Sequence, residues 1–108
     1  MTLENVITIL EQTGYPVAYD HFPRAVPSIP YIAVTVTGTD NVYGDNGVYK
    51  QVMGFQIELC TEIKSPEQEK VLTDVLDANG ICWQLLSEAY DADDGVYSLL
   101  YNFSEVYE

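Results

Sequence analysis

Few residues in this chain have the type and spacing that catalysis needs. His21 is the single histidine and stands between Asp20 and Phe22, just before a proline-rich stretch. A carboxylate can orient an imidazole as a general base, so a hydrolase that uses His21 is chemically possible. A Ser-His-Asp or Cys-His arrangement would have to be built entirely around this one residue. We therefore interpret His21 as a structural loop residue and predict no catalytic residues.

Two groups of oxygen-bearing side chains could bind a cation. Asp91, Asp93 and Asp94 precede Gly95, but this glycine comes one place too early for an EF-hand loop and no glutamate closes it. The second group is the segment 45–47, with the sequence Asp-Asn-Gly. We interpret the first group as the solvated tip of a hairpin and the second as a turn. A weak ion site is the alternative, and we predict no metal or other cofactor.

The two cysteines are not spaced for a metal site or a disulfide framework. Cys60 and Cys82 lie far apart in the sequence, with no CxxC pair. We predict that both are reduced and buried in the core.

Length and charge restrict the class of protein. A chain of 108 residues is the size of one domain, so we expect a single domain over residues 1–108. It has 17 acidic residues against 4 basic ones, a formal charge of −13. This charge opposes binding to nucleic-acid phosphates and to anionic lipid. No spanning segment or secretory signal is visible, so we expect a cytosolic protein without membrane contact.

Two stretches predict amphipathic helices. The first follows Thr2, repeats apolar residues at helical spacing and stops at Gly14. The second begins at Ser65, where Pro66 and Gln68 complete a capping-box pattern, and it ends at Asn79-Gly80. Its buried stripe should consist of Val71, Leu72, Val75 and Leu76.

The remaining segments predict strands and loops. We expect strands over 17–19, 31–37, 49–61, 81–90 and 96–107, an irregular connection over 21–30 and a loop over 38–47. Alternation in the 49–61 strand places Phe55, Ile57 and Leu59 on one face. The predicted fold class is α+β, an antiparallel or mixed sheet of about five strands with two helices packed on one face. The order is α-β-β-β-α-β-β.

Nine tyrosines could suggest a platform on which bases stack. Such platforms lie in basic grooves, which four basic residues cannot supply. Core packing is the better interpretation, and contact between subunits is the alternative that stays open.

Several motifs, taken in order, resemble a known family. They are Gly14-Tyr15-Pro16-Val17-Ala18-Tyr19-Asp20-His21-Phe22, Pro30-Tyr31-Ile32, Tyr43-Gly44-Asp45-Asn46, Ile57-Glu58-Leu59-Cys60-Thr61, Asn79-Gly80-Ile81 and Tyr101-Asn102-Phe103. This series resembles the tail-completion or tail-terminator (head-tail joining, minor tail) proteins of long-tailed phages and prophages of Gram-positive bacteria. The resemblance covers nearly the whole chain.

The resemblance implies a virion structural protein and no enzyme. It implies a homo-oligomeric ring, expected to be a hexamer, that caps the head-proximal end of the tail tube and joins it to the head connector. The implied partners are the tail tube and the head-completion proteins. The implied location is the host cytoplasm during assembly and then the virion tail or neck. DNA could pass through such a ring without tight binding, because acidic walls repel phosphates.

Irregular segments on a rigid sheet commonly carry binding contacts. The candidate subunit or partner contacts are therefore Arg24 and Val26 in the proline segment, and Asp40, Asn41, Tyr43, Asp45 and Asn46 in the loop between strands. The high negative charge also fits a different class, an acidic binding module that mimics DNA and occupies a basic protein partner.

Overall fold

The computed structural model describes residues 2–20, 29–39, 41–44, 47–93 and 95–106. Its elements are α1 (Leu3–Glu11), β1 (Val17–Tyr19), β2 (Tyr31–Thr39), β3 (Val42–Gly44), β4 (Gly47–Lys50), β5 (Val52–Thr61), α2 (Pro66–Ala78), β6 (Gln84–Asp91) and β7 (Val96–Val106).

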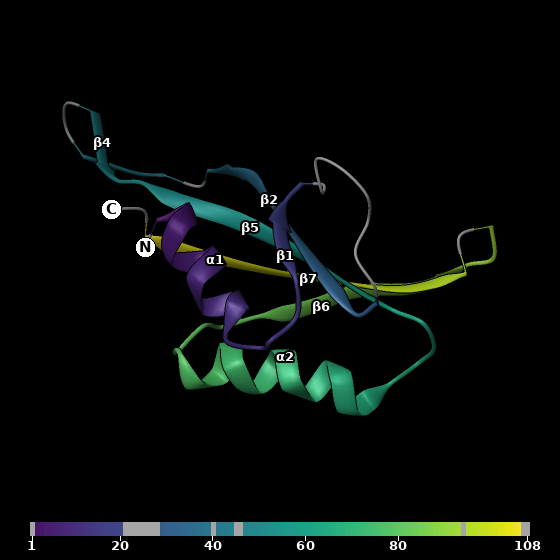
Figure 1. The fold of residues 1–108 in the computed structure, drawn as a ribbon. Coiled ribbons are helices and arrows are strands. Elements are labelled where there is room, and N and C mark those ends of the chain that lie inside the picture. Colours follow the sequence, from purple (N-terminus) through teal and green to yellow (C-terminus); the bar gives the residue numbers. More distant parts are fainter. Residues whose placement is uncertain (1, 21–28, 40, 45–46, 94, 107–108) are drawn as a thin grey trace.

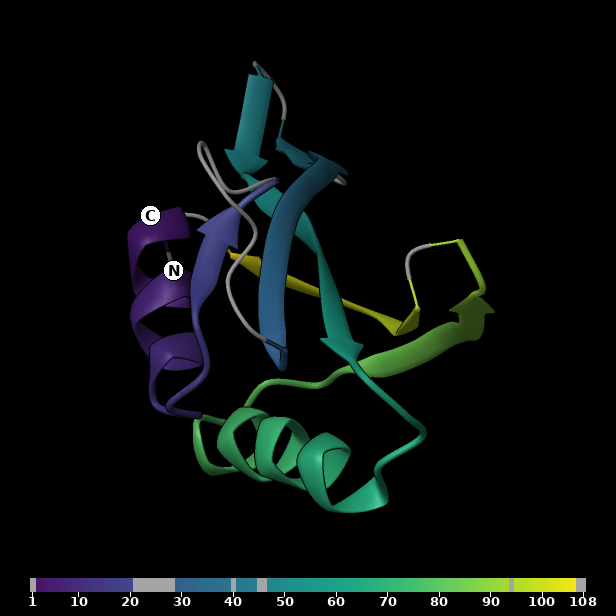
Figure 2. The same cartoon turned by 45° about the vertical axis from the view of Figure 1, so that its right-hand side comes forward.

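Five of the strands form one mixed sheet. Their order across the sheet is β1-β2-β5-β7-β6, with β1 parallel to β2 and every other pair antiparallel. Both helices cover the same face of this sheet (Figures 1 and 2). The predicted fold class and the order of its elements are therefore confirmed.

The sheet is elongated, and a hairpin extends from each end. The molecule measures 51 × 27 × 23 Å. In Figure 1, β3 and β4 project at one end of β5, while the turn between β6 and β7 projects at the other. β3 and β4 form a separate two-stranded sheet.

Local hydrogen bonds explain where α1 begins. The Thr2 hydroxyl accepts a hydrogen bond from the Asn5 backbone N–H at 3.1 Å, and the Asn5 side chain accepts one from the Thr2 backbone N–H at 3.0 Å. This reciprocal capping box satisfies donors that the first turn leaves unpaired. α1 ends at Glu11, and Gly14, the predicted stop, follows it with a φ of +83°.

The end of α2 explains one difference from the prediction. The Gly80 N–H donates to the Asp77 carbonyl at 3.1 Å and the Ile81 N–H donates to the Leu76 carbonyl at 3.0 Å. With Gly80 at a φ of +71°, these two bonds form a Schellman motif. Ile81 thus belongs to the helix cap, and β6 begins at Gln84 instead of residue 81.

The core lies between the sheet and the two helices. Its fully buried side chains include Val6, Leu10, Ile32, Val34, Phe55, Ile57, Leu59, Leu72, Leu76 and Leu99. The rings of Phe55 and Phe103 stack with their centroids 5.2 Å apart. The predicted alternation along the central strand is therefore confirmed over β5. The stripe on α2 is narrower than predicted, because Val71 is 37% exposed.

Three further sequence predictions were wrong. The 49–61 strand is two strands, because β4 pairs with β3 whereas β5 pairs with β2 and β7. The 38–47 loop contains the end of β2, all of β3 and the start of β4. Cys60 is a buried free thiol as predicted, but Cys82 is exposed, since it follows the helix cap.

None of the helices in the described ranges has the length and apolar character needed to cross a membrane.

Candidate functional site

Most of the contact residues predicted from the sequence lie outside the described ranges. These are Arg24, Val26, Asp40, Asp45 and Asn46, together with the candidate base His21. Asn41 is placed with its side chain, whose Oδ1 accepts a hydrogen bond from the Val52 backbone N–H at 3.3 Å. Tyr43 lies in β3, and its backbone is paired with Val48 of β4. Asn41 thus fixes the point where the β3–β4 hairpin joins β5.

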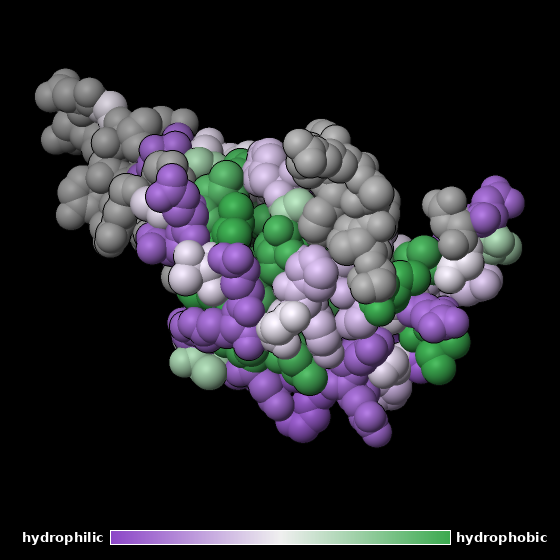
Figure 3. Space-filling model, in the orientation of Figure 1, coloured by the Kyte–Doolittle hydropathy of each residue, from purple (hydrophilic) through white to green (hydrophobic). Residues whose placement is uncertain are grey.

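The most exposed element of the sheet is its edge strand β6. Every residue from Gln84 to Asp91 is exposed, although the strand is paired along one side with β7. Leu85, Leu86 and Tyr90 are 46%, 52% and 58% exposed. Figure 3 shows apolar residues, in green, at the β6–β7 hairpin, which projects on the right of the view. Apolar side chains on an unpaired strand edge are typical of a place where another chain docks.

The register shows which way these side chains face. Leu85 lies opposite Tyr101 and Tyr90 lies opposite Tyr97. Tyr101 belongs to the buried core and Tyr97 packs against it, so Leu85 and Tyr90 lie on the face that carries the helices. Because both nevertheless remain exposed, the helices leave the β6 margin of this face open.

A charged cluster joins α2 to β6 beside this margin. The Lys64 ammonium lies 2.8 Å from Glu69 Oε1 and 2.7 Å from Glu88 Oε2, and 5.8 Å from the centre of the Tyr97 ring. Hydrogen bonds to Glu69 and then Glu88 raise the pKa of Lys64, while the bond from Lys64 lowers the pKa of Glu88. The cluster holds the start of α2 against the exposed strand.

The tip of the β6–β7 hairpin is acidic. Asp91 Oδ1 accepts a hydrogen bond from the Asp93 N–H at 3.0 Å, and the Asp91 carbonyl accepts one from the Gly95 N–H at 2.8 Å. Gly95 has a φ of +65°, which glycine adopts without strain. The hairpin predicted from the sequence is confirmed, with Asp94 outside the described part. Among the described residues, no three potential ligands gather as a metal site.

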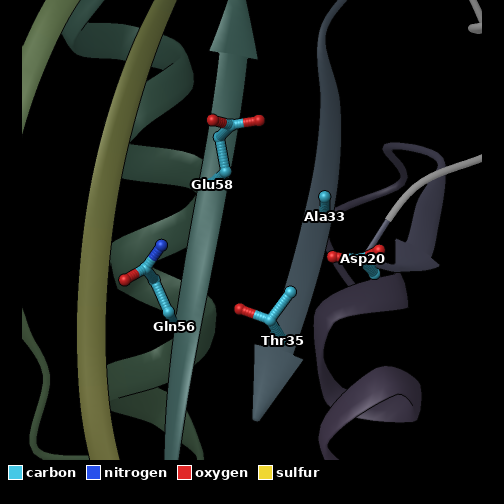
Figure 4. A pocket seen from close by; sticks show the side chains of 5 residues that line it. All are labelled: Asp20, Ala33, Thr35, Gln56 and Glu58. Carbon is cyan, nitrogen blue, oxygen red and sulfur yellow. The ribbon is translucent and has the colours of Figure 1, made fainter. Parts of the chain in front are cut away.

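Neither helix covers the opposite face of the sheet, where polar side chains gather between β2 and β5. Figure 4 shows a shallow pocket there, with Gln56 and Glu58 on β5, Ala33 and Thr35 on β2, and Asp20 just after β1. Its volume is about 190 Å³. The described residues that line it include two carboxylates, an amide and a hydroxyl.

Cys60 lies on this same face but is shielded from solvent. Its Sγ donates a weak hydrogen bond to Glu58 Oε1 at 3.4 Å and lies 3.8 Å from Ser98 Oγ. Burial raises the pKa of the Cys60 thiol, with a smaller opposite effect from Tyr31. A buried thiol with a raised pKa is a poor nucleophile at neutral pH.

Sequence reasoning missed the exposed residues of β6. A signal was present, because Leu85 and Leu86 are consecutive and a strand cannot turn two neighbouring side chains to the same face. The structure resolves this with a bulge between Leu85 and Ser87, where the register shifts against β7. Both leucines are exposed.

No protein-family model matches this chain, and no curated protein matches its sequence. Among solved structures, the chain is similar to one described as "Virion of native gene transfer agent (GTA) particle". The two share 16% identity with a TM-score of 0.49, over 96% of this chain and 88% of the other. A likeness of this degree carries no argument about function.

Proposed function

We propose that this protein is a non-catalytic structural component of a phage-like virion. In this proposal it assembles as a ring, expected to be a hexamer, at the head-proximal end of the tail tube. There it ends tube growth and joins the tube to the head connector. It is made in the host cytoplasm and remains in the tail or neck of the particle.

The observation that carries this proposal is the exposed apolar edge of β6. Within the described sheet β6 is an edge strand with β7 as its neighbour, and the apolar side chains of Leu85, Leu86 and Tyr90 on it are exposed. Such an edge favours docking onto other protein chains and is a poor setting for chemistry on a small molecule. The particular assembly proposed, a ring at the end of the tail tube, is based on the sequence motifs that resemble the tail-terminator family.

The acidic charge has a role in this proposal. A ring of subunits, each with a formal charge of −13, would repel DNA phosphates along its channel. The genome could then slide through without adhering.

Electron microscopy of tails assembled with and without this chain tests the proposal. We expect tubes of uncontrolled length when the chain is absent, and defined length when it is restored. Restoration with a Leu85→Ser, Leu86→Ser, Tyr90→Ser variant should fail. Restoration with Ile63→Ser, which removes an exposed apolar side chain (69% exposed) that does not belong to β6, should succeed. Normal tails without the chain would refute the proposal.

The high negative charge keeps a second candidate open, an acidic module that mimics DNA. Native mass measurement separates the two functions. A ring, or co-sedimentation with tail tubes, favours the virion protein, while a tight one-to-one complex with a nucleic-acid-binding enzyme favours the mimic.

A further inference from the structure

Packing does little to hold β6 in place. Every residue from Gln84 to Asp91 is exposed, and a bulge between Leu85 and Ser87 shifts the register of the strand against β7. Strands with few buried contacts open locally more easily than the core of a protein does. The position of the β6 surface therefore depends on backbone pairing with β7 and on side-chain contacts that tie the strand to the helix layer.

Lys64 provides such a contact. It lies in the connection between β5 and α2, and its ammonium lies 2.8 Å from Glu69 in the first turn of α2 and 2.7 Å from Glu88 in the middle of β6. The same ammonium lies 5.8 Å from the centre of the Tyr97 ring, which belongs to β7. One cation thus joins the helix layer to both strands of the projecting hairpin.

The Glu69 carboxylate makes this cation hard to dispense with. The Glu69 side chain is 16% exposed, and its Oε2 is shielded from solvent and has no hydrogen-bond partner among the described residues. Without Lys64, this poorly solvated charge would be left close to the Glu88 carboxylate, because both now contact the same ammonium. Repulsion between the two carboxylates would then push β6 away from the start of α2.

Lys70 offers a matched comparison. Its ammonium lies 2.9 Å from Asp74, one turn further along the same helix, and both side chains are exposed. This pair stays within α2, so its loss does not change how β6 is held. Exposed pairs of this kind contribute little to stability. A difference between the two lysines therefore separates the link between two elements from the loss of one positive charge.

We propose that Lys64 is a positioning residue for the β6 surface, and that Lys64, Glu69 and Glu88 form a latch that ties the middle of the strand to the first turn of α2. With the latch closed, Leu85 and Tyr90 are held in one arrangement on the face that carries the helices. When the charge of Lys64 is removed, β6 opens locally and this arrangement is lost, although the sequence of the strand is unchanged. The inference rests on the proposed function, because it assigns the control of the same surface.

Native-state hydrogen exchange, read by NMR on the whole chain, tests the latch. Lys64→Met keeps the aliphatic stem but removes the charge. We expect the β6 amides that pair with β7 to exchange about fivefold faster in this variant, while the amides of β5 change by less than about twofold. Lys70→Met should leave both sets within about twofold of the parent, and Lys64→Arg should restore protection because it keeps the charge. Glu88→Gln, which opens the latch from the strand, should accelerate the same β6 amides.

The same variants enter the tail assay. Tails restored with Lys64→Met should have uncontrolled length, whereas those restored with Lys70→Met or Lys64→Arg should have a defined one. Equal acceleration of exchange in β5 and β6 would mean a general loss of stability and would overturn the latch. Local opening of β6 with tails of defined length would overturn the positioning role.

The two assays also separate this inference from the proposed function. Unchanged exchange in Lys64→Met, with tail length still dependent on the chain, would refute the latch and leave the proposed function standing. Normal tails in the absence of the chain would refute the proposed function and with it the positioning role, and the exchange rates of β6 would still decide whether the latch exists.

Discussion

Replacement of Gly54 by alanine should destabilise the protein through one close contact. A Cβ built at Gly54 would lie 2.7 Å from Thr37 Oγ1, while Gly38 O and Ser104 Oγ would be at 3.5 Å and 3.9 Å. Thr37 stands at the register shift between Val36 and Gly38, where β2 bulges against β5. Gly54 is thus the residue that gives this bulge room.

The magnitude follows from the geometry. Ordinary contact begins at 3.4 Å, so the Thr37 side chain must move by about 0.7 Å or change rotamer. Overpacking of this kind costs about 1–3 kcal/mol. The loss of glycine's freedom in the unfolded chain offsets about 0.4–1 kcal/mol. We expect a net loss of about 0.5–2 kcal/mol and a fall in Tm of about 3–10 °C.

Urea and thermal unfolding of a double-mutant cycle measure this effect. Gly54→Ala in a Thr37→Ala background should cost little, because the atom that clashes is gone. In a Thr37→Val background the loss should persist, because a methyl group replaces the hydroxyl at the same place. The reasoning is refuted if Gly54→Ala is as stable as the parent, or if Thr37→Ala leaves its cost unchanged.

Three other predictions concern stability and reactivity. A Cβ added at Gly80 would meet no atom within 4 Å, but the backbone there has a φ of +71°. Gly80→Ala should therefore lower the free energy of unfolding by about 1–2 kcal/mol through backbone strain alone, as chemical unfolding would measure. An unchanged free energy of unfolding would contradict the assigned helix cap. Burial, then the nearby Glu69 charge, raises the pKa of Tyr101 from 10.0 to about 12. Between about pH 10 and pH 12 the folded state therefore keeps the Tyr101 proton while the unfolded state loses it. The contribution of Tyr101 to the free energy of unfolding is complete below pH 10 and falls as pH rises toward 12. Tyr101→Phe should flatten that decline in pH-dependent unfolding, and an unchanged slope would exclude Tyr101 as its source. A thiol reagent at neutral pH should label Cys82 rapidly and Cys60 only on unfolding, as mass spectrometry of peptides would show; equal rates would contradict their different burial.

Much of the fold was predictable because local chemistry determines it. The caps at Thr2 and Ser65 depend on side chains within three residues of each helix start, and the sequence displays them directly. Alternation along β5 likewise predicted that Phe55 and Leu59 are buried, because one face of the sheet packs on the helices.

The errors came from partners that lie far away in sequence. Alternation runs unbroken through Gln51, but β4 and β5 pair with different strands, and pairing is a tertiary property. Apolar Ile81 was assigned to a strand, although its N–H completes the cap of α2. The prediction that Cys82 is buried used the average behaviour of cysteine, and its position after that cap leaves it in solvent.

The candidate site was less predictable than the fold. The contact residues were chosen on irregular segments, while the exposed surface that stands out belongs to a regular strand. Whether Leu85 and Tyr90 are buried depends on whether a helix extends over the β6 margin of the sheet, and no local sequence pattern encodes how far the helices reach.

The long pairing of β5 with β7 has a mechanical consequence. Their register is unbroken from Val52 opposite Val106 to Thr61 opposite Tyr97, and the two projecting hairpins lie at opposite ends of this pair. Tension between those ends would act parallel to the strands and perpendicular to the hydrogen bonds that join them. Rupture would have to shear the whole ladder at once, so the molecule should resist pulling along this axis far better than peeling from β1.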